Sequence, residues 1–302
     1  MIETKGLTKI FDGHAAVDRL TLTIEDGEVF GFLGPNGAGK TTTVRMLTSL
    51  IAPTSGTARV LNYEVGRDDQ EIRRNVGILT EMPGLYDRLS AWRNLMIYGK
   101  LYEVDDVERQ VEKYLRWLEL WDRRDGLAGE FSKGMKQKLA IARALIHEPR
   151  VLFLDEPTAG LDPEASKLVR DFISELRGQG RTIFICTHNL DEADRLCDRV
   201  AVFKSQLRVV DTPAQLRQQL YGRQIVIHFA QDASEFAVVV DNFPDIRSCE
   251  VVGNKLLITL DDPERDNPEI IRRLVDAGAH IQFVGEIRHS LEDIYLQLLD
   301  ED

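Results

Sequence analysis

A glycine-rich segment at residues 34–41 has the residue types and the spacing that bind phosphate groups. It reads Gly-Pro-Asn-Gly-Ala-Gly-Lys-Thr and matches the pattern G-x-x-x-x-G-K-[ST]. Glycines let the backbone turn sharply and direct its N–H groups at phosphate oxygens. Lys40 would reach the β- and γ-phosphates of a nucleotide, and the Thr41 hydroxyl would bind Mg²⁺. The residues predicted to contact the nucleotide here are Gly34, Asn36, Gly37, Ala38, Gly39, Lys40, Thr41 and Thr42.

Two adjacent carboxylates, Asp155 and Glu156, follow an apolar run at residues 151–154. Side chains at the carboxyl end of such a strand emerge at the edge where ligands bind in open α/β sheets. We predict that Asp155 holds Mg²⁺ and that Glu156 polarises the attacking water as a general base. A solvated strand end would give the same local sequence. The pair indicates a catalytic site only because the sequence also contains a phosphate loop.

The elements that must position these groups are predicted in a suitable order. Residues 28–33 form an apolar run typical of a buried strand, and residues 40–50 have the apolar spacing of a helix. Residues 68–145 are rich in helical patterns. Strand candidates at 151–154 and 182–186 follow, with a helix at 164–177 between them. This alternation predicts a mostly parallel sheet flanked by helices.

Residues 131–137 carry the most specific signal in the chain. They read Phe-Ser-Lys-Gly-Met-Lys-Gln, and a run ending in Arg-Ala-Leu follows at 138–145. This resembles the signature motif L-S-G-G-Q of ATP-binding cassette (ABC) proteins, with Phe, Lys and Met replacing the Leu, the first Gly and the Gln. Ser132 and Gly134 are kept and match the family positions that contact the nucleotide. A serine N-cap of an amphipathic helix would look the same, and both roles are compatible because helix N-termini bind phosphate.

Further features follow in the order of this family. The segment 157–162, Pro-Thr-Ala-Gly-Leu-Asp, resembles the loop that crosses the dimer interface. His188 matches the switch histidine, and Phe11 matches the aromatic residue that stacks on adenine. Glu81 stands where the γ-phosphate-sensing loop of the family usually has Gln. A carboxylate can bind Mg²⁺ but repels phosphate, so a metal ligand and a solvated loop acid are both open interpretations of Glu81.

The resemblance covers residues 1 to about 220. It implies an α/β P-loop NTPase cassette with a mixed core sheet and a helical subdomain, with ATP and Mg²⁺ as ligands and Lys40, Glu156 and His188 as catalytic residues. It also implies that two cassettes pack head to tail, each ATP being held by one chain's phosphate loop and the other chain's signature. Because the sequence has one loop and one signature, we expect a homodimer.

The residues after 222 predict a second domain, which gives domains of 1–222 and 223–302. Their patterns run strand, helix, strand, strand, helix, strand, which is the order of a ferredoxin-like α+β sandwich. Residues 223–302 hold 7 Lys and Arg against 17 Asp and Glu, which argues against nucleic acid as a partner of this part. The tail is similar to the extra C-terminal domain on ATPase subunits of bacterial drug and polysaccharide exporters.

No apolar stretch reaches the roughly 20 residues that cross a bilayer, and residues 1–5 have no apolar signal core. We therefore expect a cytoplasmic protein, peripheral on the cytoplasmic face of the cell membrane, that drives a membrane-spanning subunit on a separate chain. The candidate contact with that subunit is the segment 82–86 together with Trp92 and Leu95, and ordinary helical core is the equally open interpretation of these apolar residues.

The three cysteines, Cys186, Cys197 and Cys249, do not have the spacing of metal ligands. Cys186 lies in an apolar run and is expected to be a buried small hydrophobic residue. A reducing cytosol fits this pattern.

Other functions share parts of the sequence. A soluble cassette ATPase that acts on ribosomes or nucleic acid would share the motifs, but such proteins commonly carry two cassettes or a long coiled-coil insertion, which this sequence lacks. A P-loop kinase or GTPase would share the phosphate loop, and a GTPase would need an N-K-x-D motif, which is absent. The intact Glu156 and His188 argue against a non-catalytic module. We therefore expect the ATP-hydrolysing subunit of an ABC transporter, with export favoured by the tail.

Overall fold

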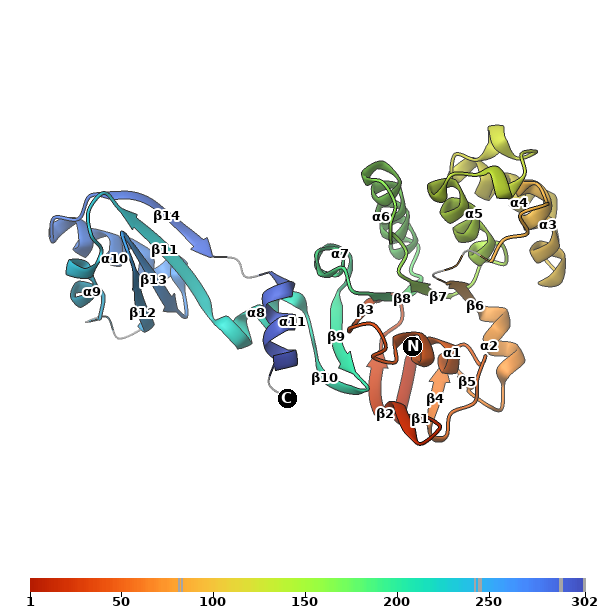
Figure 1. Cartoon of the computed structure of the whole chain (residues 1–302), viewed down its shortest axis with the longest axis horizontal. Coiled ribbons are helices and arrows are strands. Elements are labelled where there is room, and N and C mark those ends of the chain that lie inside the picture. The colour runs from red at the N-terminus through yellow and green to blue at the C-terminus, as the bar shows by residue number, and fades with distance from the viewer. Residues whose placement is uncertain (81, 83, 242, 244–245, 288–289, 301–302) are drawn as a thin grey trace. The chain divides into compact units, whose positions relative to one another are not determined.

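The computed structural model of the chain forms two compact units, Met1–Asp211 and Thr212–Asp302 (Figure 1). It describes residues 1–80, 82, 84–241, 243, 246–287 and 290–300. The sequence prediction put the boundary after Gly222, whereas the division falls at Asp211, so helix α8 (Pro213–Tyr221) belongs to the second unit. The reason is packing, because α8 contacts the C-terminal helix of that unit.

The first unit is built on a six-stranded sheet with the order β10-β9-β3-β8-β7-β6. All neighbouring strands are parallel except β10, which runs antiparallel to β9. Strands β3, β7 and β8 are buried at every position, which is typical of parallel strands covered on both faces. The predicted, mostly parallel sheet is therefore confirmed. The strands are β3 (Val29–Leu33), β6 (Val76–Leu79), β7 (Val151–Asp155), β8 (Thr182–Thr187), β9 (Arg199–Lys204) and β10 (Gln206–Asp211).

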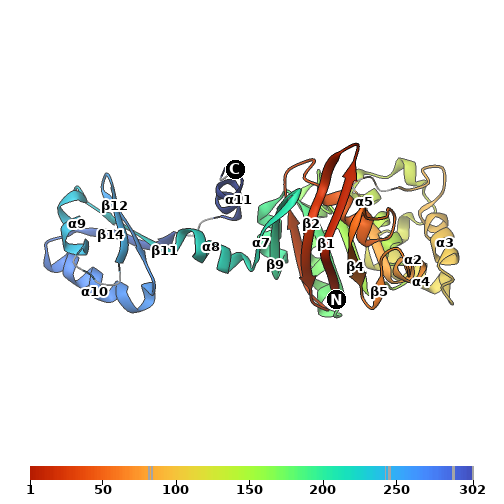
Figure 2. The ribbon, with the colours of Figure 1, turned by 90° about the horizontal axis from the view of Figure 1, so that it is seen from below.

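A second, antiparallel sheet of the same unit has the order β2-β1-β4-β5, with β1 and β2 side by side in Figure 2. Leu20, Leu22 and Ile24 of β2 are buried and alternate with exposed residues, because one face of this sheet packs inward. They belong to the same core cluster as Phe32 and Phe203 of the central sheet. The strands are β1 (Ile2–Phe11), β2 (His14–Ile24), β4 (Ser55–Val60) and β5 (Tyr63–Glu64).

The helices of the first unit confirm the helix-rich middle of the chain. Helices α3, α4 and α5 contact one another and form the predicted helical subdomain. Helix α1 ends before the expected Leu50, since the Thr48 hydroxyl donates to the Val44 oxygen at 2.7 Å and Ser49 has φ +57°. The helices are α1 (Lys40–Leu47), α2 (Asp69–Asn75), α3 (Ala91–Leu101), α4 (Val107–Trp117), α5 (Lys133–Leu145), α6 (Pro163–Gly178) and α7 (Leu190–Leu196), with 3₁₀ turns at Trp121–Arg123 and Ala128–Glu130.

The second unit has the predicted βαββαβ order and a fully antiparallel sheet ordered β12-β13-β11-β14. Its hydrophobic core includes Ile227 of β11 and Leu274 of α10. Helix α10 begins at Pro263 rather than at the expected Pro268, because Asp262 accepts a hydrogen bond from the N–H of Arg265 and caps it. The elements are β11 (Arg223–Phe229), α9 (Ser234–Asp241), β12 (Ile246–Val252), β13 (Lys255–Leu260), α10 (Pro263–Asp276), β14 (Ile281–Ile287) and α11 (Leu291–Asp300).

Within the ranges that the structure describes, no helix combines the length and the apolar composition needed to cross a membrane.

Candidate active site

Residues 34–39 form a loop between β3 and α1, which is the context that a phosphate loop requires. Gly39, directly before α1, has φ +102°, a conformation that favours glycine. A Cβ atom at Gly39 would overlap the backbone oxygen of Ala16, and one at Gly34 would overlap that of Phe203. The loop therefore lies so close to β2 and β9 that neither position has room for a side chain.

The side chain of Lys40 lies inside this loop and is only 7% exposed. Its ammonium donates hydrogen bonds to the backbone oxygens of Gly34, at 2.5 Å, and Pro35, at 3.2 Å. The positive charge is thus held beside the N–H groups at the start of α1, where phosphate is favoured. Of the other predicted contacts, Asn36, Gly37 and Thr41 are exposed, Thr42 is half-buried and Ala38 is buried.

The predicted acid pair lies at the same edge of the sheet as the phosphate loop. Strands β3 and β7 both run parallel to β8, so their carboxyl ends lie together. Asp155 is the last residue of β7, and its Oδ2 accepts a hydrogen bond from Thr41 Oγ1 at 2.9 Å. Two of the predicted metal ligands, Thr41 and Asp155, are therefore adjacent, although they are far apart in the sequence.

Glu156 follows Asp155 with φ +50°, an uncommon conformation for a residue other than glycine. Its backbone N–H donates to the oxygen of Cys186 at 2.8 Å. Its Oε1 accepts the N–H of His188 at 3.1 Å and lies 2.7 Å from His188 Nδ1, while Oε2 accepts the Thr187 hydroxyl at 3.2 Å. The Thr187 hydroxyl at the end of β8 and the His188 N–H directly after it thus fix the carboxylate. Its side chain is 13% exposed, whereas that of His188 is 62% exposed and open to a ligand.

Cys186 lies in β8, directly before Thr187, and is fully buried. Burial raises the pKa of its thiol well above the ordinary value, so it stays protonated and apolar. The expectation of a buried small hydrophobic residue is confirmed.

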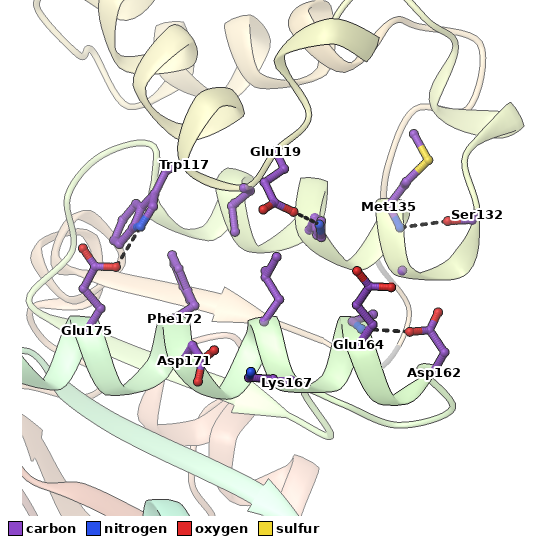
Figure 3. A pocket seen from close by; sticks show the side chains of 15 residues that line it. Trp117, Glu119, Ser132, Met135, Asp162, Glu164, Lys167, Asp171, Phe172 and Glu175 are labelled. Carbon is purple, nitrogen blue, oxygen red and sulfur yellow. Dashed lines mark hydrogen bonds and ion pairs between the residues drawn. The ribbon is translucent and has the colours of Figure 1, made fainter.

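The signature residues lie at the start of α5. The Ser132 hydroxyl accepts the N–H of Met135 at 3.2 Å and caps the helix, as one interpretation of the sequence required. Ser132 and Gly134 line a cleft of about 600 Å³ between the helical subdomain and α6 (Figure 3). Trp117 and Glu175 face each other at the other end of it, joined by a hydrogen bond of 2.9 Å. Lys40, Thr41, Asp155 and Glu156 do not line this cleft, so within one chain the signature and the phosphate loop lie apart.

The comparisons with known proteins identify the family. The ABC transporter family profile matches residues 17–159, and the profile of the ATP-binding protein DrrA1-3-like C-terminal domain matches residues 212–299. The Nod factor export ATP-binding protein I of Rhizobium sp. (strain N33) is 33% identical over 300 residues, which cover 98% of this chain and 96% of that protein. The chain belongs to the ATP-binding subunits of ABC transporters.

Two further likenesses agree with this. The ABC subunit is 33% identical to the bacitracin transport ATP-binding protein BcrA of Bacillus licheniformis, over 99% of this chain and 97% of that protein. A solved dimeric structure of a bacterial ABC transporter cassette superposes with a TM-score of 0.65 and 25% identity, covering 70% of this chain and 98% of that one. The subunit is thus an ATPase whose hydrolysis of ATP is coupled to transport, with the predicted cassette fold.

The side chains at the site are suited to bind Mg²⁺ and a nucleotide. The Thr41 hydroxyl and the Asp155 carboxylate are the hard oxygen ligands that Mg²⁺ prefers, and this ion usually binds one or two protein groups together with substrate phosphates. The glycines of the loop and the buried Lys40 suit the phosphates.

Two predicted site residues remain, Phe11 and Glu81. Phe11 is the last residue of β1, is 46% exposed, and has the Lys9 ammonium 5.1 Å from its ring centroid. Its ring is therefore accessible to a flat ligand such as adenine. Glu81, the predicted replacement of the family's Gln, lies outside the described residues.

Sequence reasoning missed a buried contact between the loop after the acid pair and the helix after His188. The Thr158 hydroxyl donates to Glu192 Oε2, and Arg170 Nη1 lies 3.4 Å from Glu192 Oε1. Glu192 is only 6% exposed. These residues line one cleft with Glu156 and His188. Thr158, Arg170 and Glu192 come from three separate segments, so their spacing along the chain does not predict the contact. The only sequence feature that could have indicated it is the position of Glu192 on the buried side of α7.

Two side chains of α5 tie the signature helix to neighbouring loops. Gln137 Nε2 donates to the backbone oxygen of Pro157 at 2.7 Å. Arg143 donates to the backbone oxygens of Gly84, at 2.9 Å, and Ile78, at 3.5 Å. The helix that begins at the signature is thus bonded directly to the loop after the acid pair, to β6 and to the segment after β6.

Proposed function

We propose that this ABC subunit drives export through a membrane-spanning subunit on a separate chain. The Nod factor relative supports the direction, because it is named for export and is similar over nearly the whole chain. The main support for ATP hydrolysis at this site is a pair of contacts beside the phosphate loop. Thr41 is hydrogen-bonded to Asp155, and the next residue, Glu156, contacts His188.

The nucleotide would be held by charge and by stacking. The loop amides and Lys40 neutralise the phosphates, with the glycines providing a close approach of the backbone. Phe11 stacks on the adenine, which its exposed ring supports. The proposed nucleotide contacts of one chain are Phe11, Gly34, Asn36, Gly37, Ala38, Gly39, Lys40, Thr41 and Thr42.

Hydrolysis would use the groups at the ends of β7 and β8. Thr41 and Asp155 hold Mg²⁺, which when bound neutralises charge on the β- and γ-phosphates. Glu156 accepts a proton from the attacking water, and its carboxylate is aimed by the bonds from Thr187 and His188. The exposed ring of His188 contacts the γ-phosphate while it holds Glu156 in place.

Completion of the site would need a second copy of the chain. The signature lies apart from the phosphate loop within one chain, and the similar solved cassette is dimeric. In a head-to-tail homodimer, Ser132 and Gly134 of one copy contact the ATP on the loop of the other. ATP then bridges both copies and favours closure, and loss of the γ-phosphate removes contacts and allows opening.

The membrane-spanning partner would contact the helical subdomain from the cytoplasmic side, so that the subunit is peripheral to the membrane. Met82 is 80% exposed, Tyr86 is 50% exposed and Leu101 of α3 is 70% exposed, and they supply an apolar surface. Leu95 of α3 is fully buried, which supports its interpretation as helical core rather than as a contact with the partner.

We assign residues 1–211 to the nucleotide-binding cassette and the remainder to an acidic accessory domain. The match to the DrrA1-3-like C-terminal domain begins at residue 212, where the second compact unit also begins. This agreement supports a boundary before α8 rather than after it.

Glu156→Gln tests the proposal. The amide keeps the size of the side chain but cannot accept the proton, so we expect phosphate release to fall on the order of 100-fold or more. ATP binding should stay close to wild type, and with Mg-ATP the variant should migrate as a dimer in size-exclusion chromatography. Glu71→Gln, a half-buried carboxylate of α2, is the matched control. Normal hydrolysis by the Glu156 variant would refute the assignment of the base.

A further inference from the structure

Glu192 of α7 is a buried carboxylate that the proposed reaction leaves without a role. Its side chain accepts a hydrogen bond from the hydroxyl of Thr158, which is itself only 9% exposed. Its other oxygen lies 3.4 Å from Nη1 of Arg170 in α6. Replacement of a buried ion pair by well-packed apolar residues is often neutral for stability. The stability of the fold alone therefore does not account for a carboxylate at this position.

The partner of this carboxylate, Thr158, belongs to the turn that begins at the proposed general base. Glu156 has φ +50°, and its backbone oxygen accepts the N–H of Ala159 at 3.1 Å. Residues 156–159 thus form a hydrogen-bonded turn, with Thr158 as its third residue. Because Glu156 is the first residue of this turn, a displacement of Thr158 would rotate the backbone from which the Glu156 carboxylate projects.

A second set of bonds joins Glu192 to the carboxylate of Glu156 itself. The Thr187 hydroxyl donates to Glu156 Oε2 at 3.2 Å and accepts the N–H of Asn189 at 2.9 Å. The Asn189 side chain accepts the N–H of Glu192 at 3.2 Å and caps α7. The backbone of Glu192 is thus bonded to the segment that holds the Glu156 carboxylate, and its side chain is bonded to the turn that holds the Glu156 backbone.

We propose that Glu192 is a positioning residue for ATP hydrolysis, which acts through Thr158 to keep the Glu156 carboxylate within reach of the attacking water. The inference rests on the proposed role of Glu156 as general base. Proton transfer requires hydrogen-bond distance, and a displacement of about 1 Å can slow a reaction on the order of 100-fold. Loss of the bond between Thr158 and Glu192 therefore slows hydrolysis and leaves ATP binding unchanged, because neither residue is among the proposed nucleotide contacts.

Thr158→Val tests this, because it keeps the shape of the side chain and removes the hydroxyl that Glu192 accepts. For the full-length chain with Mg-ATP, we expect kcat for phosphate release to fall on the order of tenfold, while KM and the number of ATP molecules bound per chain stay within about twofold of wild type. Thr158→Ser keeps the hydroxyl and should retain most of kcat.

Glu192→Met tests the other partner, since it removes the acceptor at nearly constant length. It should lower kcat to about the same extent as Thr158→Val, and the double variant should be at most about threefold slower than the slower single variant, because the two residues act as a unit. Asp191→Ala is the matched control. It removes an exposed carboxylate from the same helix and should keep kcat within about threefold of wild type.

A second measurement separates positioning of the base from general damage to the fold. In a Glu156→Gln background the base is already absent, so adding Thr158→Val should leave the residual rate of hydrolysis within about threefold. A loss of folded protein would instead lower this rate by the same factor as in the wild-type background.

Wild-type kcat in Thr158→Val, or a further loss on the order of tenfold in the Glu156→Gln background, would overturn the role of Glu192 while the proposed function stands. Normal hydrolysis by Glu156→Gln alone would remove the general base, and the role of Glu192 would fail with it.

Discussion

The hydroxyl of Thr41 and the carboxylate of Asp155 are hydrogen-bonded at 2.9 Å, which joins the start of α1 to the end of β7. We predict that Asp155→Asn lowers Mg-dependent ATP hydrolysis on the order of 100-fold, because it keeps the shape of the side chain and removes the charge that holds the metal. Phosphate release titrated with Mg²⁺ measures the effect. Nucleotide binding in the presence of EDTA should be unchanged.

Thr41 offers the matched comparison for this prediction. Thr41→Ser keeps the hydroxyl and should retain most activity, whereas Thr41→Val keeps the shape and should lose it. Equal activity of the serine and valine variants would show that the hydroxyl binds no metal.

Lys40 is the second group to test, because its buried ammonium lies against the oxygen of Gly34 at 2.5 Å. Lys40→Ala should weaken ATP binding on the order of tenfold to a hundredfold, since a charge-assisted contact to phosphate is lost. Isothermal titration calorimetry with ATP measures this, with the exposed Lys100→Ala as control. Unchanged affinity for ATP would contradict the phosphate role of Lys40.

Much of this site could be predicted from the sequence because its parts are local. The residues 34–41 form one continuous loop, and Asp155 and Glu156 are neighbours at the end of one strand. In such motifs, the spacing along the chain is also the spacing in space. Their meeting at one edge followed from the parallel order of the strands, and the bond of Thr41 to Asp155 agrees with it.

What could not be predicted depends on which elements pack together. Glu192 meets Thr158 and Arg170 from three separate segments, so no pattern along the chain reports the contact. Leu95 has the spacing of an amphipathic helix, which shows that one face is buried but not against what, and it is buried inside the helical subdomain. The start of α10 depended on the cap at Asp262, which a proline further along obscured.

The phosphate loop allows a test of steric fit with two glycines. Gly39→Ala should abolish ATP binding and lower the melting temperature, because its Cβ would overlap the oxygen of Ala16. Gly37 also has a positive φ, of +81°, but a Cβ there would meet no atom within 4 Å. Gly37→Ala should therefore cost the folded protein only the backbone strain, about 1–2 kcal/mol. Differential scanning fluorimetry without nucleotide compares the two variants, and equal losses of melting temperature would contradict the close packing of Gly39.

The last prediction concerns pH and His147, which stacks on Tyr102 at 3.8 Å and has its Nε2 3.0 Å from the backbone oxygen of Val76. Burial lowers the pKa of His147 from 6.5 to about 4. Between these values the unfolded chain binds more protons than the folded one, so stability falls as the pH falls. The limiting slope for one such group is about 1.4 kcal/mol per pH unit.

His147→Gln should remove this slope between about pH 7 and pH 5. That window avoids the neighbouring Glu148, whose pKa is lowered from 4.5 to about 2 and whose contribution is lost only at more acidic pH. Urea unfolding followed by tryptophan fluorescence reports on the first unit alone, because Trp92, Trp117 and Trp121 all lie in it. The exposed His14→Gln is the control and should keep the wild-type slope. Equal slopes for His147→Gln and the wild type would mean that His147 is protonated at the same pH in the folded and unfolded chains.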